Sequence, residues 1–202
     1  MLHMFVNDFG EEFAPMIAVD SGNTVAADDT NSLRYGMRTN GKRGFVFVNH
    51  YQRLTELADI ENAVISAENV EFPPIDVKGE VSFFMPFNMK MGDSVLEYAT
   101  AQPLCKCDDT YFFAEIPNIK AEYKFSKGSA NIVTVPFENA KYMRKLNGTV
   151  YIGGGCNLYE ENGQIHSVED GEYICQKWNG SEFETLKIGQ SAKQSNVEIT
   201  GV

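Results

Sequence analysis

The sequence predicts an all-β protein, an antiparallel β-sandwich of one or two packed subdomains with a short N-terminal helix. Asn-Gly pairs recur at 40–41, 147–148, 162–163 and 179–180. Each lies beside a short segment in which apolar residues alternate with other residues. Asn-Gly accepts the positive φ angles of tight hairpin turns. Strands do not alternate with helical segments, which excludes a (β/α)8 barrel for these residues. A chain of 202 residues is long enough to bury a sizeable core.

The first sixteen residues predict one amphipathic helix. Apolar side chains recur there at spacings of three and four, the period of a single helix face. They are Leu2, Phe5, Phe9, Phe13 and Met16. Pro15 ends the pattern because it cannot donate a backbone hydrogen bond. Gly10 weakens the helix by about 1 kcal/mol relative to alanine, so the helix needs a surface to pack on. A polar linker follows.

Strand patterns begin at Ser32. Leu33, Tyr35 and Met37 alternate with polar or small residues, which is typical of a half-buried strand. Residues 45–48 are apolar at every position, as in a strand covered on both faces. Further strands are expected beside the later Asn-Gly pairs and over 63–71, 80–86, 94–100, 110–116, 120–126 and 131–136. Residues 139–146 predict a second helical turn.

Charge and composition exclude several classes of partner. The formal net charge is −11 and the sequence shows no basic stripe, so nucleic acid is not an expected partner. No stretch approaches the roughly 20 apolar residues that span a bilayer, so we expect no membrane partner. The N-terminus lacks the basic and apolar regions of a signal peptide, which favours the cytoplasm.

The four cysteines are expected to be reduced, partly buried thiols. They are Cys105, Cys107, Cys156 and Cys175, and four cysteines permit three disulfide pairings, between which the sequence does not choose. Cys105 and Cys107 can share one face of a strand. Zinc sites usually place two residues between paired cysteines, and no histidine lies near this pair. We therefore expect no metal and no cofactor.

No catalytic constellation is recognisable in the sequence. A nucleophilic triad needs a histidine held between a nucleophile and an acid, and the chain has only His3, His50 and His166. His50 ends the apolar strand, and a structural role is expected for it. Gly153-Gly154-Gly155 follows a strand without a helix after it, so a tight backbone crossing explains the run better than a phosphate loop.

Carbohydrate chemistry has few candidates. Glycosidases use two carboxylates that flank the scissile bond. Glu97, Glu115 and Glu122 lie on expected strands, but nothing in their spacing brings them together, and acids on edge strands also protect against aggregation. Trp178, the only tryptophan, precedes an Asn-Gly turn. Its ring is a candidate for stacking on a sugar, and the alternative is that it covers the turn.

Several segments together resemble a known family. They are 5–16 (FVNDFGEEFAPM), 29–35 (DTNSLRY), 44–53 (GFVFVNHYQR), 85–89 (MPFNM) and 96–104 (LEYATAQPL). The first resembles the stretch that closes the catalytic barrel in bacterial β-galactosidases of glycoside hydrolase family thirty-five. The others resemble the all-β domain that follows this barrel. The likeness covers about residues 2–125 well and the remainder loosely.

The resemblance implies retaining hydrolysis of terminal β-galactosides, with two barrel glutamates as acid/base and nucleophile. The acid/base normally lies in an Asn-Glu-Tyr segment, and this chain contains no Asn-Glu dipeptide. Neither glutamate is therefore assigned to a position here, and the chain is expected to be inactive alone. The implied role is an accessory domain that braces the barrel and shapes its substrate-pocket rim. The rim candidates are Asn49, His50, Tyr51, Gln52, Arg53 and Trp178.

The expected organisation has three parts. Residues 1–20 form a remnant helix from the end of the missing barrel, 21–190 the all-β accessory domain, and 191–202 a flexible tail. The barrel is the expected partner, in the same chain or in another. Two alternatives stay open: a stand-alone binding module for galactosides, and an assembly domain that forms a homo-oligomer through an exposed apolar face of the N-terminal helix.

Overall fold

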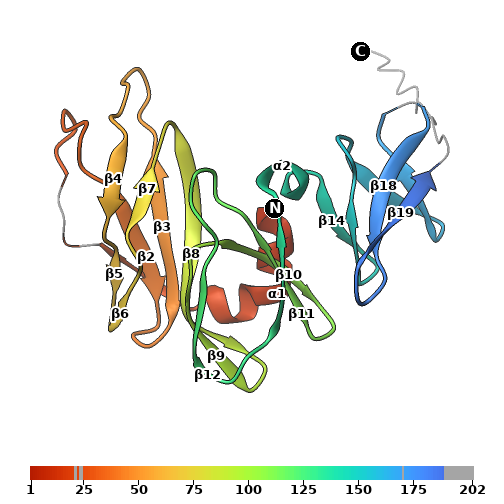
Figure 1. The fold of residues 1–202 in the computed structure, drawn as a ribbon, viewed down its shortest axis with the longest axis horizontal. Coiled ribbons are helices and arrows are strands. Elements are labelled where there is room, and N and C mark those ends of the chain that lie inside the picture. The colour runs from red at the N-terminus through yellow and green to blue at the C-terminus, as the bar shows by residue number, and fades with distance from the viewer. Residues whose placement is uncertain (21, 23–24, 170, 189–202) are drawn as a thin grey trace, which may run out of the picture. The chain divides into compact units, whose positions relative to one another are not determined.

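The computed structural model describes residues 1–20, 22, 25–169 and 171–188. The chain divides into two compact units, Met1–Phe137 and Glu138–Val202 (Figure 1). Strands dominate both units, which confirms the all-β prediction. The division falls inside the range 21–190 that the sequence analysis treated as one domain, whereas the expected tail 191–202 lies outside the described residues. Among the described residues, no helix has the length and hydropathy needed to cross a membrane.

Among its described residues, the first unit holds one helix and thirteen strands. In chain order they are α1 (Leu2–Phe13), β1 (Ile17–Asp20), β2 (Tyr35–Thr39), β3 (Gly44–His50), β4 (Ile60–Ala63), β5 (Ser66–Ala67), β6 (Val70–Glu71), β7 (Ile75–Val77), β8 (Val81–Met91), β9 (Ser94–Ala99), β10 (Gln102–Cys107), β11 (Thr110–Ala114), β12 (Tyr123–Lys127) and β13 (Asn131–Val135). The short helix α2 (Phe137–Ala140) follows at the boundary.

A six-stranded antiparallel sheet, in the order β1-β2-β3-β8-β9-β12, forms the centre of this unit. Figure 1 shows β2, β3 and β8 side by side. Phe45 and Val46 on β3 are both buried, although neighbouring strand residues point to opposite faces. The prediction of a strand covered on both faces is therefore confirmed.

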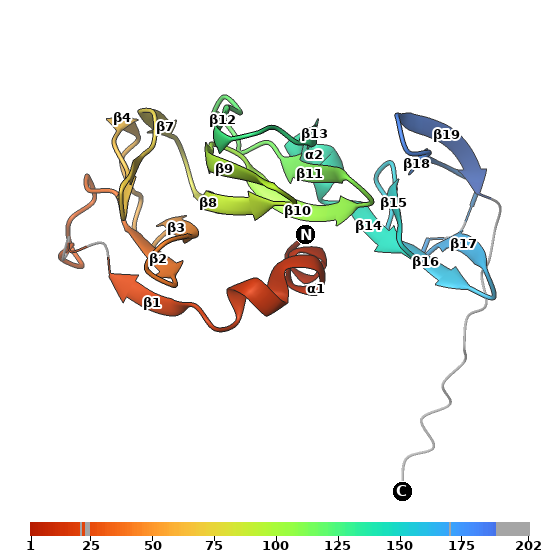
Figure 2. The same cartoon turned by 90° about the horizontal axis from the view of Figure 1, so that it is seen from below.

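The helix α1 covers one face of this sheet (Figure 2). Phe5 makes edge contacts with Phe45 at 5.1 Å and with Phe84 at 4.7 Å between ring centroids. The Asp8 carboxylate accepts a 2.8 Å hydrogen bond from the backbone N–H of Lys106 on β10. The predicted helix is confirmed, but the expectation that its phenylalanine face lies exposed is wrong, because Phe5 packs in the core of its own unit.

Short strands β4 to β7 cover the other face of the sheet, where Ile65, Phe72 and Val77 join the core formed by β3 and β8. The single strand expected over 63–71 is wrong. Glu68 has φ of +53°, and this left-handed conformation turns the chain, so that β5 and β6 pair with each other as a hairpin.

A third sheet of the first unit was only partly expected. It has the order β10-β11-β13, and β11 pairs with β13 in parallel. The strand β10 was not among the expected strands, since proline is rare inside sheets. Pro103 is tolerated because β10 lies at the sheet edge and its register shifts between Pro103 and Cys105.

The second unit contains a four-stranded sheet in the order β14-β15-β18-β19 and a separate hairpin, β16-β17. The strands are β14 (Met143–Leu146), β15 (Thr149–Ile152), β16 (Leu158–Glu161), β17 (Gln164–Ser167), β18 (Tyr173–Trp178) and β19 (Phe183–Ile188). Residues 139–146 are not one helical turn, because α2 ends at Ala140 and Met143–Leu146 forms the strand β14. The pairing of β14 with β15 accounts for the difference.

Candidate functional site

The rim candidates Asn49 to Arg53 lie at the end of β3 and in the loop after it. The exposed side-chain oxygen of Asn49 accepts a 2.7 Å hydrogen bond from Oγ of Ser82, its partner on β8. The backbone N–H of Thr55 donates to the Gln52 carbonyl oxygen at 3.2 Å and closes a tight turn. The candidates thus belong to one short, hydrogen-bonded loop.

His50 is an anchor of this loop. Its side chain is only 1% exposed, and Nε2 donates a 3.0 Å hydrogen bond to the carbonyl oxygen of Ala58. The other ring nitrogen, Nδ1, is buried and has no hydrogen-bond partner. The tautomer with its hydrogen on Nε2 fits this arrangement, since a hydrogen on Nδ1 would be a buried donor without an acceptor. The ring is therefore inside the protein and does not face a ligand.

Gln52 joins two segments that carry the family resemblance, 29–35 and 44–53. Its amide nitrogen donates to the Ala27 carbonyl oxygen at 2.9 Å, and its amide oxygen accepts a hydrogen bond from Nη1 of Arg34. Nη2 of Arg34 donates to the Asp29 carbonyl oxygen at 2.8 Å. The two segments therefore form one hydrogen-bonded structure at the end of the sheet.

The Asp29 carboxylate organises the turn before β2. It accepts backbone hydrogen bonds from Asn31 at 2.9 Å and from Ser32 at 3.1 Å. The Ser32 side chain, followed by the Asn31 N–H, lowers the pKa of Asp29 below its usual value of 3.8. A carboxylate of this kind stays charged at neutral pH, so it supports the loop and is unsuited to donate a proton.

A pocket of about 580 Å³ opens beside this loop. We call it the Tyr51 pocket. Its lining residues are Tyr51, Gln52, Leu54, Thr55, Glu56, Leu57, Asp59, Gly79 and Glu80. The backbone N–H of Gly79 donates to the Asp59 carboxylate at 2.9 Å and joins two of its walls. Leu54 is 96% exposed and has φ of +63° at the turn.

The lining of the Tyr51 pocket suits a polyhydroxylated ligand. Tyr51 is 47% exposed, so its ring is accessible for stacking on an apolar sugar face. Glu56, Asp59 and Glu80 supply carboxylate oxygens, which accept hydrogen bonds from hydroxyl groups. Neither histidine nor cysteine is among the lining residues. The arrangement offers groups for recognition and lacks a nucleophile–histidine pair.

Sequence reasoning found Tyr51 and Gln52 but missed the three acids of the pocket. Glu56, Asp59 and Glu80 come from two connections separated by more than twenty residues. The pairing of β4 with β7, and of β3 with β8, brings these connections together. The only signal in the sequence was a group of acids shortly after the Asn-His-Tyr-Gln-Arg run.

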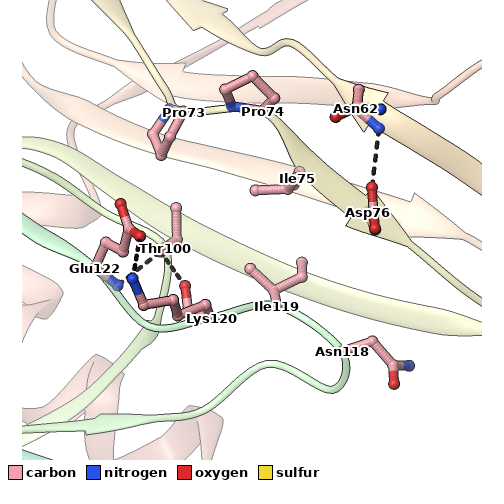
Figure 3. Close-up of a pocket in the computed structure, with 10 residues that line it drawn as sticks. All are labelled: Asn62, Pro73, Pro74, Ile75, Asp76, Thr100, Asn118, Ile119, Lys120 and Glu122. Carbon is pink, nitrogen blue, oxygen red and sulfur yellow. Dashed lines mark hydrogen bonds and ion pairs between the residues drawn. The ribbon is translucent and has the colours of Figure 1, made fainter.

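A second, smaller cavity of about 270 Å³ lies between β7 and the loop before β12 (Figure 3). Its polar groups largely satisfy one another. The Asn62 N–H donates to the Asp76 carboxylate at 2.9 Å, and the Thr100 hydroxyl donates to the Lys120 carbonyl oxygen at 2.7 Å. Lys120 also pairs with Glu122 at 2.8 Å. These hydrogen bonds and this ion pair link the chain segments that line the cavity.

The remaining candidates do not contribute to either cavity. Arg53 is exposed but does not line the Tyr51 pocket. Two roles were considered for Trp178, stacking on a sugar and covering the turn, and its burial favours the second. Trp178 is 7% exposed in the second unit, where its ring contacts Phe183 edge-on. Glu97 is ion-paired with Lys124 at 2.7 Å.

Metal and cysteine chemistry add no site. Within the described ranges, no group of three or more His, Cys, Asp or Glu side chains is placed to hold a metal ion. All four cysteines are buried and reduced.

Neither a scan against protein-family models nor a search of the curated proteins finds a match to this chain.

Proposed function

We propose that this chain is a non-catalytic accessory β domain of a β-galactosidase, which braces the catalytic barrel and shapes the rim of its substrate pocket. The observation that carries the proposal is the contact between Arg34 and Gln52. It unites the two resembling segments 29–35 and 44–53 and holds them beside the Tyr51 pocket. Residues that resemble one family in sequence thus converge in space on one site.

The chemistry of the Tyr51 pocket supports a rim role. An exposed ring beside carboxylates and an amide is suited to hold sugar hydroxyls. In the resembling family both catalytic glutamates belong to the barrel. In this proposal Tyr51 contacts the substrate, while the side chains of Gln52 and His50 hold its loop in place through hydrogen bonds within the protein.

In this proposal the barrel packs against exposed apolar side chains of the first unit. Leu2 is 59% and Val6 is 45% exposed, and they lie four residues apart on the outer face of α1. Ile17 and Val19 are also exposed on the edge strand β1. Exposed apolar neighbours such as Leu2 and Val6 are typical of a protein interface.

The interface is tested by mixing the whole chain with a separately produced catalytic barrel of a bacterial family thirty-five β-galactosidase. Sedimentation velocity should show a one-to-one complex, and the double variant Leu2→Asp, Val6→Asp should weaken it at least about tenfold, since charge is placed in an apolar contact. Val168→Asp is the matched control, because Val168 is equally exposed but lies in the second unit. Equal weakening by both variants would contradict this interface.

The alternative function is a stand-alone carbohydrate-binding module, favoured by the exposed ring of Tyr51 beside three carboxylates. Calorimetric titration with galactose, lactose and galactan separates the two functions. An independent module gives saturable binding, and Tyr51→Ala abolishes it. Arg53→Ala is the control and leaves binding intact, because Arg53 is exposed but does not line the pocket. A rim that needs the barrel gives no saturable heat with the chain alone.

A further inference from the structure

A third hollow on the first unit concentrates positive charge in an acidic protein. The chain has 28 acidic and 17 basic residues. One pocket of about 400 Å³ is nevertheless lined by four cations, Lys42, Arg43, Lys90 and Lys127, and by a single carboxylate, Asp93. We call it the lysine pocket. It is formed by the β2–β3 turn, by the ends of β8 and β12, and by the start of β9.

The sheet register places Lys90 and Lys127 on either side of Val95, on the strands that flank β9. Lys90 lies directly opposite Val95, and Val95 lies directly opposite Lys127. Residues paired across antiparallel strands point to the same face, and two strand spacings separate the two lysines by about 10 Å. Long side chains from both flanks can close over one small anion above Val95.

The turn that carries Lys42 and Arg43 is fixed against the same strands. The Asn40 side-chain oxygen accepts hydrogen bonds from the backbone N–H groups of Lys42 at 3.1 Å and of Arg43 at 3.2 Å. The Asn88 amide donates to the Lys42 carbonyl oxygen at 2.9 Å and ties the turn to β8. The side chains of Lys42 and Arg43 therefore extend from a backbone that these hydrogen bonds hold in place.

Some lysines of the first unit have a carboxylate partner, and others do not. Lys124 pairs with Glu97 and Lys120 with Glu122. In the part of the chain that the structure describes, the ammonium groups of Lys42, Lys90 and Lys127 have no ion pair or hydrogen bond. Arg43 is the exception in the pocket, since it is 2.7 Å from Glu12.

We propose that the lysine pocket binds a phosphate or sulfate group, either as the free ion or as the ester of a small molecule. Three unpaired ammonium groups around one hollow repel one another. A doubly charged oxyanion between them attracts all three and offsets this repulsion. Each ammonium group supplies three donors to the anion oxygens. The hollow exceeds a single oxyanion in size, which leaves room for the rest of an ester. This proposal is independent of the accessory role.

The test is an amide NMR titration of the whole chain with inorganic phosphate and inorganic sulfate, at an ionic strength held constant with chloride. Saturable shifts are expected at the amides of Lys42, Gly92 and Lys127. Galactose 6-phosphate and galactose 6-sulfate form the second arm. Tighter binding of an ester than of the free ion assigns the site to a phosphorylated or sulfated molecule, and the reverse assigns it to the ion.

Variants test whether the lysine pocket is the site at which the anion binds. The double variant Lys90→Ala, Lys127→Ala should weaken binding at least about tenfold, because charged hydrogen-bond partners are lost. Lys124→Ala is the matched control on the same strand as Lys127, and it should change binding less than about twofold. Absence of saturable shifts with all four probes, or equal losses in the double variant and in Lys124→Ala, would overturn the proposal.

Discussion

Nε2 of His50 donates a hydrogen bond to the carbonyl oxygen of Ala58 across the loop that follows β3. His50 is fixed in the sheet by its pairing with Val81, whereas Ala58 lies where the loop returns to the protein. The bond therefore sets the path of the residues between them, which include Tyr51 and Leu54 of the Tyr51 pocket.

Replacing His50 should destabilise the first unit. His50→Ala removes a buried ring and its hydrogen bond, so we expect the free energy of unfolding in urea to fall by about 3 kcal/mol. Asn49→Ala, at the exposed neighbouring position, should cost less than about 1 kcal/mol. Equal losses in the two variants would contradict the anchoring role of His50.

Asp29 should titrate at unusually low pH. Because the Ser32 side chain and the Asn31 N–H lower its folded pKa below 3.8, Asp29 stabilises the folded state above that pH. This contribution is lost as the pH falls through the lowered folded pKa. A carboxyl NMR titration should give a midpoint below 3.8, and Ser32→Ala should raise it. Thr30→Ala is the control, and a midpoint that Ser32→Ala leaves unchanged would count against this origin of the shift.

Much of the fold follows from local pattern, and much of the site does not. Phe5 and Phe9 recur at helical spacing, which is sufficient to predict α1. The same spacing cannot tell whether that face meets Phe45 and Phe84 of its own sheet or another protein. The pattern is local, whereas the partner is decided by long-range packing.

The residues that line a pocket are likewise not predictable from local sequence pattern. Lys90 and Lys127 are far apart in the sequence, and only the shared partner Val95 makes them neighbours. No basic stripe is visible in the sequence because the charges come from separate strands and a turn. For Trp178 the sequence left two roles open, and only its contact with Phe183 and its burial favour the ring that covers the turn.

Gly154 should be much less replaceable than Gly163, another glycine of the second unit with positive φ. Gly154 has φ of +59°, and a Cβ there would collide with the Ile174 carbonyl oxygen. Gly163 also has positive φ, but a Cβ there would meet open space. Gly154→Ala should therefore cost about 3 kcal/mol and Gly163→Ala about 1 kcal/mol. Urea unfolding followed by the fluorescence of buried Trp178 measures both, and similar costs would disprove the close crossing.

The thiols of the second unit should be unreactive in the folded protein. Burial raises the pKa of Cys156, and burial followed by the nearby Cys156 thiol raises that of Cys175. Since the thiolate is the reactive form, iodoacetamide at pH 7 should label neither residue before unfolding and both in urea. Mass spectrometry of the peptides reads the result. Labelling of folded Cys175 as fast as free glutathione would contradict its burial.

We propose that this chain recognises a sugar or braces a barrel and leaves catalysis to that barrel. Assay of the whole chain alone with a chromogenic β-galactoside tests it most directly. The account predicts a rate no higher than that of buffer, because the pocket has neither a nucleophile–histidine pair nor the barrel glutamates of the resembling family. Turnover that disappears in Glu56→Gln or Glu80→Gln would contradict it.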